Sequence, residues 1–305
     1  DLLALLHGSE GMLGIVVEVT VQLLPIPKNI AVVLAAFNSV SEAAGTVNAI
    51  ISQGILPAGL EMMDRLAIKA AEAFVNVGYP LDAEGLLICE LDGAAAEVQH
   101  QIEKLRLILD KNNAIQVRVA TDAAERMQLW LGRKAAFPAV GRLAPDYYCM
   151  DGTIPRSELA AVLAQITKFS EQHGLDVANV FHAGDGNLHP LILYDANKAG
   201  EIERAEAFGA DILNLCIEVG GTITGEHGVG VEKIDQMCIQ FTPEELELFH
   251  GVKSAFDESR ILNPGKAVPT LSRCAEFGAM HVHTEGSQQT HVGLNAQKYS
   301  DLERF

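Results

Sequence analysis

Short apolar segments alternate with longer amphipathic segments along most of the chain, and this alternation restricts the fold more than any other feature. The short segments have the length and composition of β-strands, whereas the longer ones carry apolar residues three or four positions apart, as in an α-helix. Strands separated by helices predict an α/β or an α+β fold, and the short connections leave parallel and antiparallel pairing open. We expect strands at residues 30–37, 85–93, 115–122, 146–155 and on both sides of a turn at 184–187, and a short strand or turn at 56–64. Helices are expected at 41–53, 65–74, 94–113, 124–137, 155–174, 199–220 and 242–260.

The two ends of the chain differ from this pattern. Residues 1–27 are expected to form strands, because "GMLGIVVEVTVQLLP" alternates and is rich in β-branched residues. Pro25 and Pro27 end that segment, so we place a domain boundary between residues 27 and 28. The residues beyond Lys266 have little periodicity, which predicts a loop-rich tail. Because the chain begins with Asp1 inside an apolar segment, we expect it to be a piece of a longer protein.

Composition excludes several classes of protein. Apolar residues make up 49% of the 305 residues, as in a globular protein, and 40 acidic against 22 basic residues give a net charge of −18, which repels nucleic acid. The longest apolar run is of strand length, so no membrane span is expected. Five dispersed cysteines argue against a disulfide framework and for a reducing compartment, and no CxxC spacing is present to bind an iron–sulfur cluster.

Two histidines lie on either side of a glycine-rich turn in "HAGDGNLH". If residues 184–187 form a tight turn, His182 lies opposite His189, and two imidazoles at that separation can share one metal ion. Asp185 is expected to shape the turn. The alternative is that both histidines are ordinary sheet residues with hydrogen-bond partners.

A second glycine-rich loop, "TGEHGVG", contains adjacent Glu226 and His227. Glu226 would complete a two-histidine, one-carboxylate metal site with open positions for a substrate, and His227 would act as a base. The alternative is a solvated glutamate beside a capping histidine. Arg133, on a predicted helix, is either a clamp for a substrate carboxylate or part of a solvated helix face. From these residues alone, a metal-dependent hydrolase and a non-catalytic α+β binding module both remain open.

Five stretches together resemble the vanillyl-alcohol-oxidase-type flavoproteins, in the branch of bacterial glycolate oxidase, D-lactate dehydrogenase and D-2-hydroxyglutarate dehydrogenase. They are "HGSEGMLGIVVEVTVQLLP", "LGRKAAFPAVGRLAPDYYCMDGTIPR", "FHAGDGNLHP", "GGTITGEHGVGVEK" and "RILNPGK". The resemblance implies an α+β fold. Residues 1–27 would be the last strands of an FAD-binding domain, residues 28–270 a ferredoxin-like cap, or substrate, domain with antiparallel sheet, and residues 271–305 a tail.

The resemblance also implies roles for individual residues. His182, His189 and Glu226 would bind a divalent metal (Zn, Mn or Fe), His227 would be catalytic, and Arg133 would hold the substrate carboxylate. The cofactor FAD would lie beside residues of two segments, Ser9, Glu10, Gly11, Gly14 and Ile15 in the first and Asn263 in the second.

The implied activity is flavin-dependent oxidation of a small 2-hydroxy acid, with metal-assisted hydride transfer to FAD. Glycolate, oxidised to glyoxylate, is the first expectation for the substrate and D-lactate the second. Reduced flavin would pass its electrons to an iron–sulfur partner subunit. We expect a cytoplasmic protein, peripheral at the inner membrane through partner subunits, and a chain that is inactive without its FAD domain.

Overall fold

The computed structural model describes residues 1–270, 273 and 274, and the chain divides into two compact units. One unit consists of residues 22–226, and the other combines residues 1–21 with the chain from His227 onward. The domain boundaries expected from the sequence, at 27/28 and 270/271, remain predictions, and most of the expected tail lies outside the described residues.

The larger unit is built on a seven-stranded sheet with the strand order β4-β1-β3-β2-β6-β7-β5. Each of the strand pairings in it is antiparallel, which confirms the predicted α+β class and settles the pairing that the sequence left open. The strands are β1 (Asn29–Phe37), β2 (Gly59–Asp64), β3 (Gly85–Gly93), β4 (Gln116–Val119), β5 (Asp146–Cys149), β6 (Val177–Phe181) and β7 (Pro190–Tyr194).

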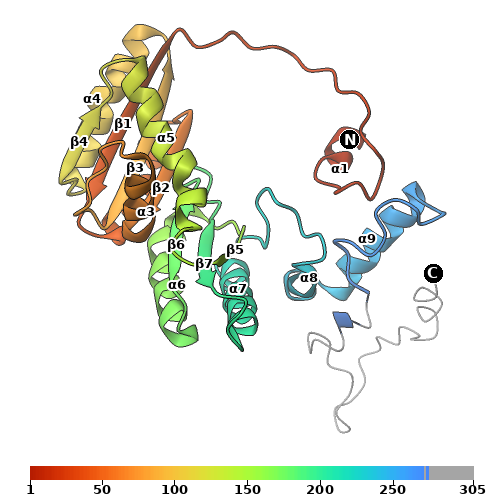
Figure 1. Cartoon of the computed structure of the whole chain (residues 1–305). Coiled ribbons are helices and arrows are strands. Elements are labelled where there is room, and N and C mark those ends of the chain that lie inside the picture. Colours follow the sequence, from red (N-terminus) through yellow and green to blue (C-terminus); the bar gives the residue numbers. More distant parts are fainter. Residues whose placement is uncertain (271–272, 275–305) are drawn as a thin grey trace, which may run out of the picture. The chain divides into compact units, whose positions relative to one another are not determined.

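Helices cover this sheet in two groups (Figure 1). One group packs as a series in which α2 contacts α4 and α6, and α6 contacts α7, while the other is the pair α3 and α5. Consistent with cover on both faces, β1 is buried over its last seven residues. The helices are α2 (Val40–Ser52), α3 (Arg65–Val75), α4 (Ala95–Lys111), α5 (Ala123–Val140), α6 (Leu159–His173) and α7 (Glu201–Glu218), and a short 3-10 helix (Arg156–Glu158) precedes α6.

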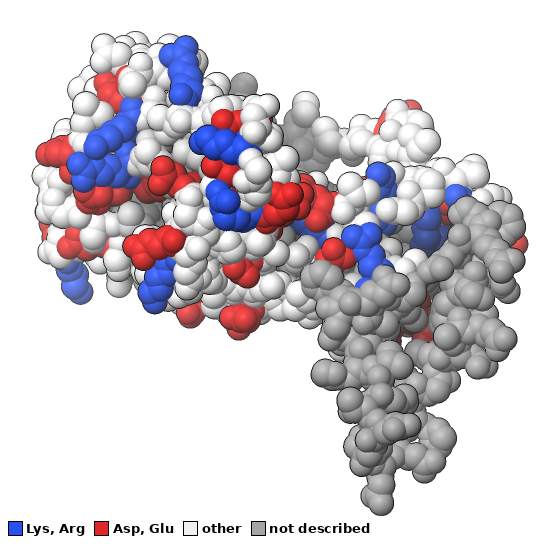
Figure 2. All heavy atoms as spheres, turned by 60° about the horizontal axis from the view of Figure 1, so that its bottom comes forward, with Lys and Arg blue, Asp and Glu red and all other residues white. Residues whose placement is uncertain are grey.

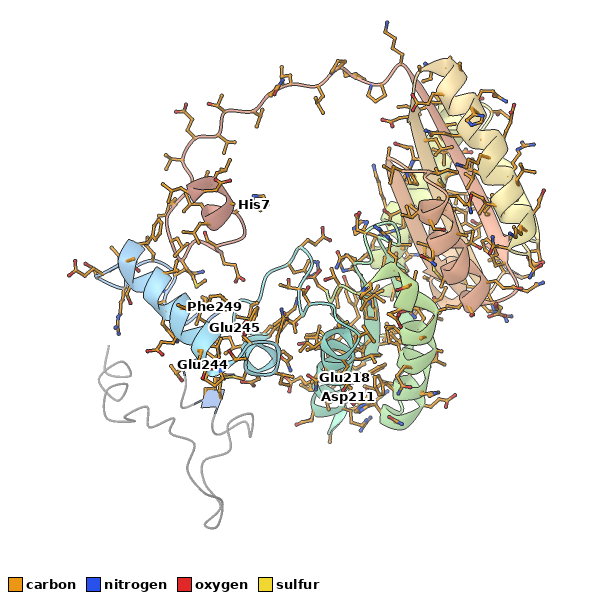
Figure 3. The ribbon with its side chains drawn as sticks, turned by 180° about the vertical axis from the view of Figure 1, so that it is seen from behind. His7, Asp211, Glu218, Glu244, Glu245 and Phe249 are labelled. Carbon is orange, nitrogen blue, oxygen red and sulfur yellow. A yellow bond between two sulfur atoms is a disulfide. The ribbon has the colours of Figure 1, made fainter. Side chains whose placement is uncertain are left out.

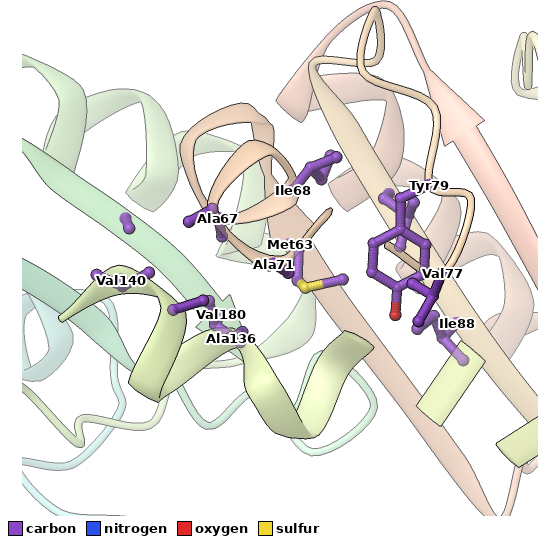
Figure 4. Packing of buried hydrophobic residues seen from close by; sticks show 14 of the residues in the cluster. Met63, Ala67, Ile68, Ala71, Val77, Tyr79, Ile88, Ala136, Val140 and Val180 are labelled. Carbon is purple, nitrogen blue, oxygen red and sulfur yellow. The ribbon is translucent and has the colours of Figure 1, made fainter. Parts of the chain in front are cut away.

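The core lies between the sheet and the α3–α5 pair (Figure 4). Alternate residues of the strands supply one side of it, including Met63 and Val180, and Ala136 and Val140 of α5 supply the other. Tyr79 is buried in the same cluster, and its hydroxyl donates a hydrogen bond to the carbonyl oxygen of Leu129. The face of α5 that bears these residues is therefore fixed toward the sheet.

Polar contacts join the other helices and occupy the surface. Nε2 of His173 in α6 lies 2.8 Å from Oδ2 of Asp211 in α7. Asp211 is labelled in Figure 3. On the face drawn in Figure 2, acidic and basic side chains are interspersed. Among the described residues, no helix is both long enough and apolar enough to cross a membrane.

The smaller unit contains the helices α1 (Leu2–Leu6), α8 (Ile234–Gln240) and α9 (Pro243–Phe256). As predicted, Thr242 is the N-cap of α9, and it forms a capping box with Glu245. Within this unit the carboxylate of Glu10 accepts hydrogen bonds from the backbone N–H groups of Val229 and Gly230, at 2.7 and 2.8 Å.

Two sequence-based expectations are wrong. Residues 1–27 form no strand: Leu2–Leu6 form α1, and the apolar side chains between Ile15 and Ile26 are exposed, because no described residue pairs with this segment as a neighbouring strand. Cys238 and Cys274 form a disulfide, which an odd and dispersed set of cysteines did not predict. The two residues are 36 positions apart, and only the fold of the smaller unit brings their Cα atoms to 5.2 Å.

The packing of α5 leads to a test of stability. A Cβ added at Gly132 would overlap the ring and hydroxyl of Tyr79, so we expect Gly132→Ala to lower the free energy of unfolding by about 1–3 kcal/mol. Gly45 of α2 has open space where a Cβ would be added, with nothing within 4 Å. Gly45→Ala should therefore raise the free energy of unfolding by about 0.5–1 kcal/mol. Urea unfolding of both variants makes the comparison, and equal effects would contradict the packing described.

Candidate functional site

The two histidines of the turn lie on one face of the sheet but not directly opposite one another. β6 pairs with β7 so that Val177 faces Ile192 and Asn179 faces Pro190, and His182 then bridges to Asn187. The predicted register, with His182 opposite His189, is therefore wrong by two residues. Diagonal neighbours in an antiparallel pair share a face and remain within reach of large side chains. The two imidazole rings accordingly lie 5.3 Å apart between centroids.

Glu226 meets both imidazoles. Its Oε1 atom lies 2.9 Å from Nε2 of His189 and 3.6 Å from Nε2 of His182. Metal–ligand bonds of ~2.1 Å in a tetrahedral arrangement separate the donor atoms by roughly 3.4 Å, and the two observed distances lie on either side of that value. The side chain of His189 is 2% exposed and that of Glu226 is 54% exposed, so the group is anchored on a buried histidine and open on the side of the carboxylate.

The other nitrogen of each ring is directed at an acceptor. Nδ1 of His182 lies 2.8 Å from Oε1 of Glu61, and Nδ1 of His189 lies 3.3 Å from the carbonyl oxygen of Met150. A neutral imidazole carries one proton, and the Glu61 carboxylate favours its placement on Nδ1 of His182. In His189 the Glu226 carboxylate is 2.9 Å from Nε2, closer than the Met150 carbonyl oxygen is to Nδ1, so without a metal either nitrogen can carry the proton.

Two imidazoles and a carboxylate are the donor types that a divalent cation of the kind expected from the sequence binds. As the side chains stand, His189, Glu226 and Asp151 offer donor atoms within 4.8 Å of one another, whereas His182 does not belong to that group. The His182 ring would therefore have to approach His189 to share a cation with it.

Arg133 extends this group on the other side of Glu61. Its Nε and Nη2 atoms donate to Oε2 of Glu61 at 2.9 and 2.8 Å, and the two side chains are each 9% exposed. Arg133 is therefore not on a solvated helix face, which was the alternative at the level of sequence. Hydrogen bonding to Glu61 is the main cause that raises the pKa of His182, against the opposing effect of burial.

Asp151 fixes the loop that carries Glu226. This carboxylate is fully buried and accepts hydrogen bonds from Thr224 Oγ1 at 2.7 Å, from the backbone N–H groups of Gly225 and Glu226, and from Asn187 Nδ2 at 2.9 Å. Asn187 belongs to the histidine turn. One buried anion thus binds both glycine-rich loops to the segment that follows β5.

Close approach between these loops requires glycine. A Cβ at Gly225 would overlap the side-chain amide of Asn187, and Gly186 has φ +75° and packs against the carbonyl oxygen of Ile154. Gly225 has no space for a side chain. Gly186 has no space either, and its positive φ is a conformation that other residues rarely adopt. Gly225 therefore serves the approach of the two loops to each other, and Gly186 serves the approach of the first loop to the segment that follows β5.

The remaining predicted site residues belong to the smaller unit. His227 follows Glu226 directly in the chain and is exposed. Asn263 donates from Nδ2 to the backbone oxygen of Glu10 at 2.5 Å, so two of the residues expected beside FAD contact one another. Ser9, Gly11, Gly14 and Ile15 lie in the same N-terminal segment as Glu10.

Sequence reasoning missed Glu61 and Asp151. Glu61 is a carboxylate inside the apolar strand "GLEMMD", and a buried charge in such a strand needs a partner, which was an available signal. Asp151 follows a predicted strand in "CMDGTIP" and gave no signal of its own, because its four donors come from segments 36 to 75 residues away.

Comparison with known families places the chain. A model of the family "FAD linked oxidases, C-terminal domain" matches residues 26–267. The chain belongs to this family. The match covers every strand of the larger unit and all the residues of the candidate metal site.

Relatives of this FAD linked oxidase domain include subunits of glycolate oxidase. The chain is 62% identical over 283 residues to glycolate oxidase subunit GlcD of Escherichia coli (strain K12), covering 93% of this chain and 57% of that protein. It is 39% identical over 266 residues to the protein of the same name from Bacillus subtilis (strain 168), covering 87% of this chain and 57% of that protein. It is 31% identical over 273 residues to a mitochondrial D-lactate dehydrogenase [cytochrome] of Arabidopsis thaliana, covering 88% of this chain and 47% of that protein. The chain thus spans about half the length of these relatives, and they lie in the branch that the sequence motifs indicated.

Structures of vanillyl-alcohol-oxidase-type flavoproteins share the fold of this FAD linked oxidase domain. p-Cresol methylhydroxylase matches with a TM-score of 0.63 at 15% identity, over 82% of this chain and 54% of its own. 4-Ethylphenol oxidase from Gulosibacter chungangensis matches with a TM-score of 0.62 at 16% identity, over 81% of this chain and 55% of its own. At such identities the likeness concerns the fold alone.

The role of Asp151 can be measured. Asp151→Asn turns a buried acceptor into a group whose amide faces N–H donors, so we expect the free energy of unfolding to fall by about 3 kcal/mol. Thr224→Val removes one of the hydrogen bonds to the same carboxylate and should cost about 1 kcal/mol. Thermal and urea unfolding measure both. If Asp151→Asn proves as mild as Thr224→Val, Asp151 does not hold the loops as described.

Proposed function

We propose that the complete protein containing this chain oxidises a small 2-hydroxy acid to the 2-oxo acid, with glycolate as the first substrate and D-lactate as the second. The observation that carries the proposal is the convergence of His182, His189 and Glu226 beside Arg133, in a chain of the FAD linked oxidase family. The names of the glycolate oxidase and D-lactate dehydrogenase relatives support this substrate class.

Arg133 would bind the carboxylate of the substrate. Glu61 occupies its Nε and one edge of Nη2, which leaves the N–H groups of Nη1 and the second N–H of Nη2 for a ligand. These remaining donors form the planar fork that suits a carboxylate. Because Glu61 also holds the guanidinium in place, little side-chain freedom would be lost when the substrate binds.

His182, His189 and Glu226 would hold the divalent metal, and His227 would take the proton of the substrate hydroxyl. When bound, the metal would supply Lewis-acid polarisation of the hydroxyl, and FAD would supply the acceptor for the hydride on the α-carbon. His227 follows Glu226 directly, so the base is tied by one peptide bond to the carboxylate ligand. Ser9, Glu10, Gly11, Gly14, Ile15 and Asn263 would contribute to the FAD site, as expected from the sequence.

Electrons would leave the flavin through an iron–sulfur partner subunit. The word "subunit" in the names of the glycolate oxidase relatives supports an assembly. The absence of a CxxC spacing in this chain supports a cluster on another polypeptide. Through such an assembly the protein would work on the cytoplasmic side of the inner membrane.

The metal ligands are tested in the complete protein. We expect the double variant His182→Ala, His189→Ala to lose bound metal, whereas His100→Ala, an exposed histidine on α4, should keep it. Inductively coupled plasma mass spectrometry after dialysis measures the metal content. Equal metal in the double variant and the wild type would remove these ligands from the proposal.

The redox activity is tested by anaerobic flavin reduction in the complete protein. Glycolate should bleach the flavin absorbance of the wild type, and His227→Ala should slow this reduction by about 10²–10⁴-fold, as for loss of a general base. Stopped-flow spectrophotometry gives the rates, with D-lactate as the second substrate. A protein without flavin absorbance would favour a hydrolase, and a normal rate in His227→Ala would exclude this histidine as the base.

A further inference from the structure

A single buried carboxylate joins the two parts of the candidate site. Oε1 of Glu61 is 2.8 Å from Nδ1 of His182, and Oε2 of the same residue is 2.9 Å from Nε and 2.8 Å from Nη2 of Arg133. Each oxygen therefore serves a different partner. One partner is in the group proposed to hold a metal, and the other is the group proposed to bind the substrate carboxylate.

The sheet places Glu61 at this position. β2 pairs with β6 so that Met63 faces Val180 and Met62 faces Phe181. The same register, continued by one residue, sets Glu61 opposite His182. Directly opposed residues have Cβ atoms ~5 Å apart, which lets a glutamate oxygen meet an imidazole nitrogen. The face that carries Glu61 is also the face that α5 covers, and Arg133 comes from that helix.

We propose that Glu61 is a positioning residue that sets both the tautomer of His182 and the orientation of Arg133, so that metal binding and substrate binding depend on one carboxylate. This inference rests on the proposed function. Glu61 touches neither the substrate nor the metal. It acts through His182, whose Nδ1 proton it holds so that Nε2 stays available, and through Arg133, whose remaining N–H groups it directs away from itself.

Only a carboxylate meets both demands. Arg133 can only donate hydrogen bonds, and His182 must donate from Nδ1 if its Nε2 is to bind a metal. The residue between them must therefore present an acceptor on each side. A glutamine of the same shape presents one acceptor and one donor. Its oxygen would remain with Arg133, so its amide N–H would face His182 and would stabilise the tautomer with the proton on Nε2.

This reasoning predicts a selective effect of Glu61→Gln. The complete protein, stripped of metal, should bind Zn²⁺ about 10–100-fold more weakly in this variant, the size of effect usual for partners of metal-bound histidines. Glu90→Gln is the matched control. Glu90 accepts a hydrogen bond from Trp130 Nε1 at 2.6 Å on the same helix α5, and a glutamine oxygen can still accept it. Isothermal titration with Zn²⁺ measures both, and equal affinities in wild type and Glu61→Gln would overturn the proposal.

A second measurement works without metal. In metal-free wild-type protein at alkaline pH, ¹⁵N shifts of the imidazole should show the proton of His182 on Nδ1, and in Glu61→Gln on Nε2. A wild-type proton on Nε2 overturns the proposal without the need for any variant. If His182→Ala binds Zn²⁺ as tightly as the wild type, the metal ligands of the proposed function are wrong. The ¹⁵N result then decides alone: an unchanged tautomer in Glu61→Gln overturns the role of Glu61, and a switched one supports it.

Discussion

The buried carboxylate of Asp151 is the constraint on which the rest of the site depends. Glycine-rich loops have many conformations, and neither "GDGN" nor "TGEHG" has regular structure that would hold it in place. Asp151 accepts hydrogen bonds from the side chain of Asn187 in the first loop and from the backbone of Glu226 in the second. Because the backbone N–H of Glu226 donates to Asp151, the Glu226 backbone is held in place, and its side chain starts from a fixed position.

The sheet supplies what the loops do not. Neighbouring antiparallel strands bring Glu61 and His182 opposite one another, and a diagonal offset leaves His189 on the same face. Helix α5 covers that face and contributes Arg133, while Tyr79 and Gly132 keep the helix close. Side chains that are distant in sequence thus share one face because strand pairing has a period of two and the helix has one buried stripe.

The fold class was predictable, and so was the approach of Glu226 to His182 and His189, because periodicity and residue type are local properties of the sequence. The register of the turn was not. Sequence alone set the turn at residues 184–187, whereas the bridge between His182 and Asn187 sets a turn of the same length one residue earlier, at 183–186, where the N–H of Gly184 donates to the Leu60 carbonyl oxygen. Glu61 and the Cys238–Cys274 disulfide escaped prediction for a related reason, since each depends on a partner brought close only by the folded chain. Residues 14–27 have the sequence pattern of a strand but form none, because no described strand pairs with them.

The pairing of Glu61 with Arg133 has a consequence for the order of binding. These two charges cancel, so the negative charges that remain around the imidazoles are those of Glu226 and of the buried Asp151 beside it. Under the proposed function these charges, in a chain of net charge −18, oppose the approach of a monoanionic hydroxy acid. A divalent cation on the proposed ligands would neutralise the two carboxylates. The electrostatics of the proposal therefore favour a sequence in which the cation enters first and the anionic substrate follows.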